Sequence, residues 1–218
     1  MKISKVLDKF KNTTTLEKLN NFILPNIKNI KNLNILEFGV DKGISTAFFL
    51  NLINNNKGKL TSVDIKNYKD LYLHKNWTFI HSKDDNYKNI ERFIKKKFDI
   101  IFLDTEHTAQ HIKKIFYYYY PKLKLNGLFI IDDIFWIPYC KGNYRDNFWI
   151  EINNKESFKM LLDIYNSNQD RFDLDFSSKH SGLAKIKKLK MSRLNKIIKL
   201  KDREFSIKNF LSKLKKLL

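Results

Sequence analysis

Cysteine, glycine and proline are scarce in this chain. Of its 218 residues, one is cysteine, six are glycine and three are proline. The single cysteine, Cys140, excludes an internal disulfide and a zinc site built from several cysteines. No apolar run approaches the roughly 18 residues that span a bilayer. Charges interrupt the hydrophobic positions of the first residues, which argues against a signal peptide. We therefore expect a cytoplasmic protein.

Acidic residues are also in short supply relative to basic ones. Lys and Arg number 42 against 23 Asp and Glu, which gives a formal net charge of +19. The segment from Lys185 to Leu218 holds 13 basic and 2 acidic residues, so +11 of that charge lies in the last 34 positions. Two explanations remain open for the excess on the rest of the chain. One is a general bias toward Asn, Lys and Ile, and the other is a polyanion-binding surface.

Between residues 33 and 186, short apolar runs alternate with longer amphipathic segments. This alternation predicts an α/β domain with a Rossmann-like, seven-stranded, mostly parallel sheet and helices on both faces. The expected strands are Leu33–Phe38, Lys59–Ile65, Trp77–His81, Asp99–Asp104, Gly127–Asp132, Phe172–Phe176 and Leu183–Ile186. The expected helices are Gly43–Ile53, Tyr87–Lys96, Thr108–Leu123 and Lys155–Asn166. Only a few residues join the last two strands, so we expect the final strand to be antiparallel.

We expect three segments along the chain. Residues 1–30 repeat apolar side chains at three- and four-residue spacing, a helical pattern that Pro25 closes. Residues 31–188 hold the α/β domain, and residues 189–218 form a basic tail. Within the domain, the run Tyr117–Tyr120 falls in a helical pattern, so we expect its rings to pack against other side chains.

The most informative segment leads from an apolar strand into a helix. The strand ends in Glu37, and the chain then turns through Gly39 and Gly43. Gly39 lets the backbone approach a ligand closely, and Gly43 permits tight packing where the helix begins. The spacing matches neither G-x-G-x-x-G nor the P-loop. Because a strand-end acid repels a pyrophosphate, a cationic or hydroxyl-rich ligand fits this turn better.

A second acid, Asp64, ends the next strand, where a carboxylate can bind both ribose hydroxyls of an adenosine. With these motifs the chain resembles the class I S-adenosylmethionine-dependent methyltransferases, whose first motif is an acid-x-Gly-x-x-x-Gly turn after the first strand. The family often has Gly-Asp after its third strand, whereas this chain has Ser82-Lys83-Asp84. The resemblance implies S-adenosylmethionine as cofactor, with these binding residues: Glu37, Gly39, Gly43, Ser45, Asp64, Ser82, Asp84 and Asp104.

Two later strands also end in carboxylates, Asp104 after one and the pair Asp132-Asp133 after the other. Carboxylates that converge at one sheet edge repel one another unless a cation is present, and hard oxygen ligands favour Mg²⁺ or a similar ion. The layout resembles the metal-dependent small-molecule O-methyltransferases, including the sugar-modifying group with Asp-x-x-His after strand four. This resemblance implies that Asp104, Asp132 and Asp133 bind the metal and that His107 is the general base.

The chemistry gives His107 a role of its own, since a hydroxyl is a poor nucleophile until a base removes its proton. Imidazole does this near neutral pH. A structural alternative stays open, in which His107 caps the following helix and the acidic pair merely ends a strand. His111 lies one helical turn beyond. We interpret it as a surface histidine rather than as a partner of His107.

Together these residues predict an S-adenosylmethionine-dependent O-methyltransferase acting on a sugar or related small molecule. The aromatic stretch Ile134–Trp149, which includes Arg145, is expected to form the acceptor wall or a lid. One alternative is an RNA methyltransferase, which the charge favours. The chain lacks the Asn-Pro-Pro-Tyr-type tetrapeptide and the catalytic cysteine pair of such enzymes. The other alternative is a non-catalytic binding protein on the same fold.

The basic tail alternates apolar residues with lysines, and its second half is amphipathic. Such a helix packs on its own domain, contacts a second subunit in a homodimer, or lies on an anionic membrane surface. Nucleic acid is a less suitable partner, because a helix that tracks phosphates gains little from so wide an apolar stripe.

Overall fold

The computed structural model describes residues 1–27, 30–135, 147–200 and 206–217. A seven-stranded sheet runs through it in the order β3-β2-β1-β4-β5-β7-β6. Its members are β1 (Asn34–Phe38), β2 (Lys59–Asp64), β3 (Trp77–His81), β4 (Phe98–Leu103), β5 (Leu123–Asp132), β6 (Phe172–Ser177) and β7 (Leu183–Lys188). The first five pair in parallel, and β7 runs antiparallel to both β5 and β6. The predicted Rossmann-like fold and its antiparallel last strand are confirmed.

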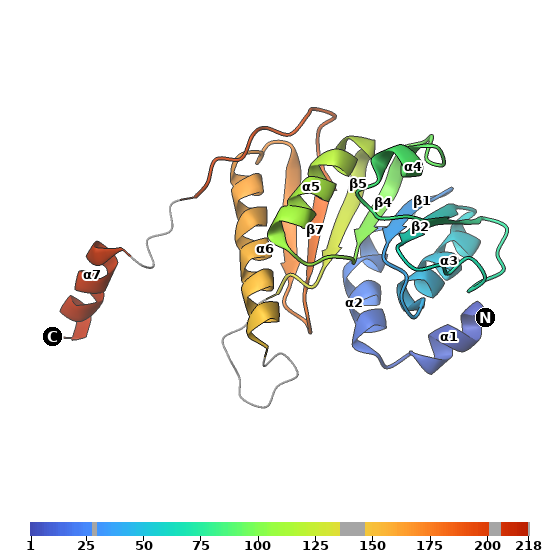
Figure 1. Ribbon diagram of the computed structural model, residues 1–218, viewed down its shortest axis with the longest axis horizontal. Helices are drawn as coiled ribbons and strands as arrows, with labels where there is room; N and C mark the ends of the chain where they lie inside the picture. Colours follow the sequence, from blue (N-terminus) through green and yellow to red (C-terminus); the bar gives the residue numbers. More distant parts are fainter. Residues whose placement is uncertain (28–29, 136–146, 201–205, 218) are drawn as a thin grey trace.

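Helices cover both faces of this sheet (Figure 1). One face carries α4 (Tyr87–Glu91), α5 (Ala109–Tyr119) and α6 (Phe148–Asn166), and the other carries α1 (Ile3–Lys9), α2 (Thr14–Phe22) and α3 (Ile44–Asn56). Two short 3-10 helices, η1 (Leu24–Asn26) and η2 (Tyr120–Lys122), link these elements. Each face has its own buried apolar cluster, and side chains of α1 and α2 belong to the second. The N-terminal helical segment is therefore packed into the domain.

Several helix boundaries differ from the predicted ones, and α3 ends at Asn56 rather than Ile53. Helix α5 ends at Tyr119, and the chain tightens into η2 because Pro121 lacks the N–H that would continue the helix. Leu123, predicted as the last helical residue, instead begins β5. Helix α6 begins at Phe148, before the predicted Lys155, because the side chain of Asn147 accepts hydrogen bonds from two backbone N–H groups of the first turn. Helix α4 ends at Glu91, well before Lys96.

The aromatic run in α5 packs as predicted. Tyr119 and Tyr120 are fully buried, and the rings of Phe116 and Tyr120 meet edge to face at 5.4 Å. The hydroxyl of Tyr119 donates to the backbone carbonyl of Asp84, 3.2 Å away. This hydrogen bond ties the aromatic core to the loop after β3, which forms part of the site described below.

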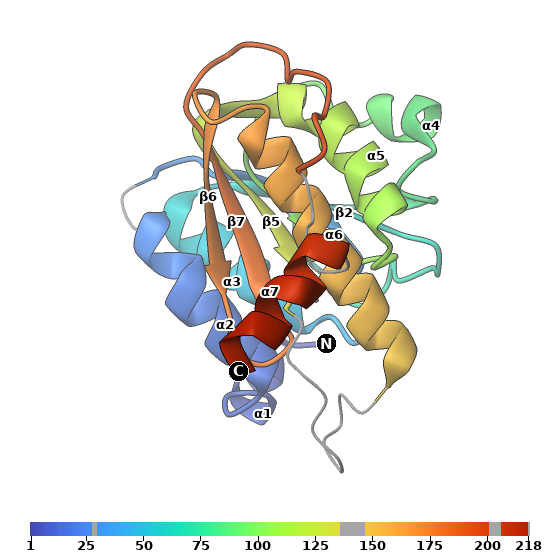
Figure 2. The same ribbon diagram turned by 90° about the vertical axis from the view of Figure 1, so that its left-hand side faces the viewer.

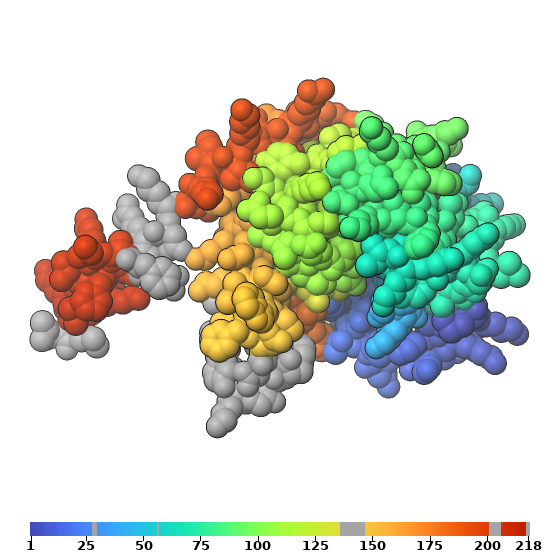
Figure 3. All heavy atoms as spheres, viewed as in Figure 1, coloured from blue at the N-terminus to red at the C-terminus, as the bar shows by residue number. Residues whose placement is uncertain are grey.

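Beyond β7, the segment 189–200 runs along the end of α6 before the chain reaches α7 (Ile207–Leu217). The backbone N–H groups of Ile198 and Leu200 donate to Ser167 and Asp163 of this region. Helix α7 then stands apart from the domain (Figure 1), and in the view of Figure 2 it lies in front of the domain. The space-filling view shows the same separation (Figure 3). No described helix has the length and apolar character needed to cross a membrane.

Candidate active site

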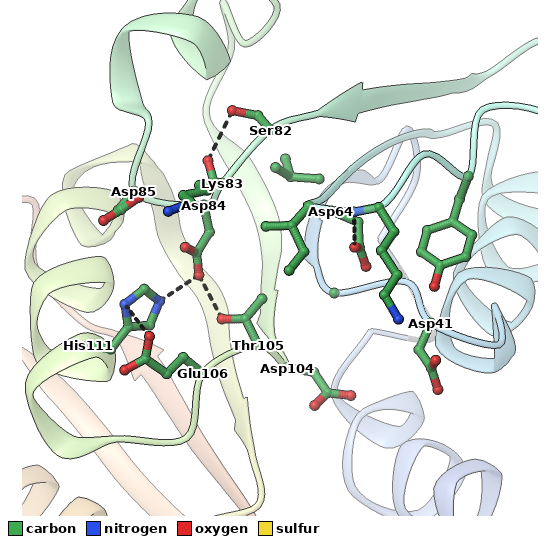
Figure 4. A pocket seen from close by; sticks show the side chains of 15 residues that line it. Asp41, Asp64, Ser82, Lys83, Asp84, Asp85, Asp104, Thr105, Glu106 and His111 are labelled. Atoms are coloured by element: carbon green, nitrogen blue, oxygen red, sulfur yellow. Dashed lines mark hydrogen bonds and ion pairs between the residues drawn. The ribbon is translucent and has the colours of Figure 1, made fainter.

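Parallel pairing brings several strand ends to one edge of the sheet. Phe38 of β1 is level with Val63 of β2 and Leu103 of β4. The residues that follow these three therefore emerge together, and a pocket of about 540 Å³ opens there. Figure 4 shows this pocket and its labelled side chains. Five of the eight predicted cofactor-binding residues line it: Gly39, Asp64, Ser82, Asp84 and Asp104.

The turn after β1 forms the floor of the pocket and uses left-handed backbone at both glycines. Gly39 has φ +93°, and a β-carbon there would lie 1.8 Å from the carbonyl oxygen of Asp104. Gly43 has φ +74° and caps α3, where a β-carbon would lie 2.6 Å from a methyl carbon of Leu71. Only glycine allows this close approach of the β1 turn to the end of β4.

Glu37 lies behind this turn and is fully buried. Its carboxyl accepts hydrogen bonds from the hydroxyls of Ser45, Thr46 and Ser62 at 2.7, 2.8 and 2.6 Å. Burial raises the pKa of this carboxyl to about 7, against the three hydrogen bonds, which lower it. Glu37, Gly43 and Ser45 are thus not among the residues that line the pocket; they support its floor from behind.

Asp64 is held rigidly at the end of β2. Its two carboxylate oxygens accept hydrogen bonds from the backbone N–H groups of Val40 and Lys66, each at 2.8 Å. The first of these bonds links the β2 end to the glycine turn. A carboxylate fixed in this way can accept further hydrogen bonds from hydroxyl groups in the pocket.

On the opposite side of the pocket, Asp84 accepts hydrogen bonds from two side chains of the next loop and helix. The Thr105 hydroxyl donates at 2.6 Å, and Nε2 of His111 lies 2.7 Å away. The carboxylate of Asp84 raises the pKa of His111. The interpretation of His111 as a surface histidine was wrong, since its side chain is only 12% exposed and lines the pocket.

Next to the pocket, two carboxylates and an imidazole converge. Nε2 of His107 lies 3.5 Å from Asp104 Oδ1 and 3.6 Å from Asp133 Oδ2. All three side chains are about one-third exposed, so solvent and ions reach them. Burial, followed by the negative charges of Asp132 and Asp133, holds the pKa of Asp104 well above its ordinary value. A positive charge placed among these groups would relieve that repulsion.

Asp132, the third predicted ligand, is not a member of this group, although its charge acts on Asp104. It is 5% exposed and forms a close ion pair with Lys18 of α2. Ligand atoms that lie within 4.8 Å of one another come from Asp104, His107 and Asp133. The two carboxylates of this group, Asp104 and Asp133, fit a hard divalent cation such as Mg²⁺, which binds through one or two carboxylates and keeps several waters.

Residues 36–134 match the family model of a methyltransferase domain. This part of the chain is a class I S-adenosylmethionine-dependent methyltransferase domain. No curated protein matches the chain by sequence.

Solved structures of methyltransferases share the fold of this domain. MycE methyltransferase of the mycinamycin biosynthetic pathway, in complex with Mg and SAH, is 16% identical with a TM-score of 0.65 over 87% of this chain. The chain spans 55% of that protein. A putative caffeoyl-CoA O-methyltransferase from Staphylococcus aureus is 21% identical, with a TM-score of 0.61 over 86% of this chain and 92% of that one. A putative rRNA-methylase from Clostridium thermocellum is 16% identical, with a TM-score of 0.59 and coverages of 80% and 96%.

Sequence reasoning missed several residues of the methyltransferase site. Thr105 and Glu106 line the pocket because they follow Asp104 directly, a signal that was available in the sequence. Lys18 gave no such signal, since it lies far from the motifs and a lone lysine in a helix is ordinarily exposed. Most of the predicted acceptor wall, including Arg145, falls outside the described residues.

Proposed function

We propose that this chain transfers the methyl group of S-adenosylmethionine to a hydroxyl oxygen of a sugar or related small molecule. The observation that carries this proposal is the meeting of Asp104, His107 and Asp133 beside a pocket that Asp64 also lines. The cofactor pocket and the polar cluster share Asp104, so a sulfonium methyl group bound in the one would face an acceptor in the other.

In the proposed complex, Asp64 binds the ribose hydroxyls, and the backbone around Gly39 lies against the amino acid part of the cofactor. Asp84 is held by Thr105 and His111 and faces the same pocket. Ser82 lines it as well. Glu37 and Ser45 act indirectly, because their hydrogen bond stiffens the turn on which the cofactor rests.

The reaction breaks the bond between sulfur and the methyl carbon while the acceptor oxygen forms a new bond to that carbon. His107 takes the hydroxyl proton, and the products are a methyl ether and S-adenosylhomocysteine. A divalent cation held by Asp104 and Asp133 would lower the pKa of the acceptor hydroxyl. We assign His107 the role of base rather than ligand, because Mg²⁺ prefers oxygen donors.

Methyl transfer to RNA is the second candidate. The net charge of +19 favours it, and a putative rRNA-methylase shares the fold. A non-catalytic role on this fold is less consistent with the polar cluster beside the pocket. Incubation with labelled S-adenosylmethionine and parallel panels of sugars, phenols and RNA distinguishes these three functions. Label transferred to RNA alone, or to no substrate, would overturn the small-molecule proposal.

The site also suggests a test of the metal. A chelator should abolish transfer to the identified acceptor, and Mg²⁺ should restore it, while S-adenosylhomocysteine still binds. Full activity in the chelator would leave Asp104 and Asp133 as structural residues, with His107 acting alone.

We further propose that α7 attaches the chain to an anionic membrane surface. Four of its apolar side chains are exposed, namely Ile207, Phe210, Leu211 and Leu214. The helix carries Lys208, Lys213, Lys215 and Lys216 and no acidic residue. The lysines of two such helices would repel each other, which disfavours a homodimer formed through α7. Anionic lipid headgroups instead complement these lysines.

A further inference from the structure

Lys18 is an unusual residue for a position inside a protein. It belongs to α2, lies between the core residues Leu16 and Leu19, and is 4% exposed. A buried ammonium is costly unless it is paired and hydrogen-bonded. The contacts of Lys18 meet that requirement through Asp132 at the end of β5 and Ser181 after β6, both far away in the sequence.

The ammonium of Lys18 makes two hydrogen bonds and one longer ionic contact. It donates to Oδ1 of Asp132 and, at 2.7 Å, to the hydroxyl of Ser181. Its nitrogen lies 3.9 Å from Oδ1 of Asp133. The same oxygen of Asp132 accepts the backbone N–H of Asp133 at 2.8 Å. One carboxylate oxygen of Asp132 is therefore committed to two donors inside the protein.

We propose that Lys18 is a positioning residue that keeps Asp132 out of the metal site, so that Asp104 and Asp133 alone supply its carboxylates. The exposures support this division, since Asp132 is buried whereas Asp133 is 39% exposed on the side of His107. The charges support it too. The formal charges of Asp104, Asp132, Asp133 and Lys18 sum to minus two, which one divalent cation neutralises. This inference rests on the metal site of the proposed function.

The test is Mn²⁺ binding, measured by calorimetry on the full chain with S-adenosylhomocysteine present, so that no methyl transfer is needed. Asp133→Asn should raise the Kd for Mn²⁺ tenfold or more, whereas Asp132→Asn should change it less than threefold. Lys18→Met should lower the Kd about tenfold, because Asp132 is then free to join the site. Loss of the Lys18 charge alone would lower the Kd by about the same factor by which Asp132→Asn raises it, so a clearly larger effect of Lys18→Met indicates that Asp132 has joined the site.

The double variant Lys18→Met/Asp132→Asn is the matched control. It leaves no buried charge unpaired and keeps the net charge of the cluster, so its Kd should return to within threefold of the unsubstituted chain. An equal loss of Mn²⁺ affinity in Asp132→Asn and Asp133→Asn would overturn the inference. So would a higher Kd for Mn²⁺ in Lys18→Met, provided that this variant still binds S-adenosylhomocysteine. If neither the unsubstituted chain nor Lys18→Met binds Mn²⁺, both the metal site and this inference are wrong. If these chains still bind S-adenosylhomocysteine, the methyltransferase proposal is unaffected.

Discussion

The carbonyl oxygen of Asp104 occupies the space that a side chain on Gly39 would need. A β-carbon on Gly39 would come within 1.8 Å of that oxygen. The two residues follow neighbouring strands of the sheet, β1 and β4. The contact sets how closely the turn after β1 approaches the first residue of the polar cluster, so the pocket and the cluster form one unit.

Gly39→Ala should therefore lower the free energy of unfolding by about 2 kcal/mol or more, since a left-handed backbone and a steric clash both oppose alanine. Urea unfolding measures the change. Asn51→Ala, an exposed position on α3, is the control and should stay within about 0.5 kcal/mol of the unsubstituted chain. Equal stability of the two variants would mean that the turn moves freely away from Asp104.

Asp64→Ala should weaken binding of S-adenosylhomocysteine by about 1–3 kcal/mol, the cost of losing charge-assisted hydrogen bonds to the ribose. Calorimetry measures this directly, and we expect micromolar affinity, about 7–8 kcal/mol, for the unsubstituted chain. Asp70→Ala removes the same charge from an exposed site outside the pocket and should leave the affinity unchanged. Tighter binding of NAD than of S-adenosylhomocysteine would overturn the methyltransferase proposal.

His107→Ala should lower turnover by about 10²–10⁴-fold, the usual contribution of a positioned general base. The Kd for Mn²⁺ should change little if His107 is the base, and should rise strongly if it is a ligand. His74→Ala is a suitable control, because His74 contacts Asn54 away from the pocket. Normal turnover in His107→Ala would mean that another group removes the hydroxyl proton.

Glu37 makes the stability of the fold depend on pH. Its pKa is raised to about 7 in the folded chain from an ordinary value of 4.5. As the pH rises from 4.5 to 7, the unfolded chain loses this proton while the folded chain keeps it, so the contribution of Glu37 to stability falls by up to about 3 kcal/mol. Below the ordinary value both states are protonated and the contribution is complete.

Glu37→Gln removes this dependence while an amide oxygen remains to accept the surrounding hydroxyls. The stability of the variant relative to the unsubstituted chain should rise between pH 4.5 and 7.5. Unfolding free energies at the two pH values give the difference, and Glu156→Gln, an exposed carboxylate on α6, should show no such change. Parallel pH profiles for Glu37→Gln and the unsubstituted chain would show that Glu37 stays ionised in the folded state.

Local patterns in the sequence predicted most of the fold because each parallel strand ends in a recognisable residue. The acids Glu37, Asp64 and Asp104 identify three strand ends, and the sheet then brings them to one edge without further information. Helix ends were less predictable, because they depend on single residues. Pro121 ends α5 and Asn147 begins α6, although neither alters the apolar periodicity.

Contacts between distant segments could not be predicted in this way. Lys18 reaches Asp132 across 114 positions, and its charge gives no indication in the sequence that α2 points it inward. His111 was misread for the same reason, since its pairing with Asp84 joins the start of α5 to the loop after β3. Both contacts follow from how helices dock on the sheet, which periodicity alone does not specify.

Binding to vesicles tests the proposed lipid surface of α7. Each lysine near an anionic bilayer contributes up to about 1 kcal/mol, and the exposed apolar face adds burial in the headgroup region. The full chain should therefore co-sediment with vesicles containing phosphatidylglycerol at low salt, bind less as salt rises, and bind weakly to phosphatidylcholine alone. Phe210→Ser/Leu211→Ser should reduce this binding, whereas Ser212→Ala, a neutral change on the same helix, should not.

A chain that ends at Leu200 is the deletion to compare, because it keeps the segment 189–200 that packs along α6. It should fold, remain in the supernatant with anionic vesicles, and keep its affinity for S-adenosylhomocysteine. Equal sedimentation of the shortened and full chains would exclude α7 as the lipid contact. If the full chain is instead a dimer by light scattering and the shortened chain a monomer, then the apolar face of α7 is a subunit interface, and the membrane proposal is replaced by self-association.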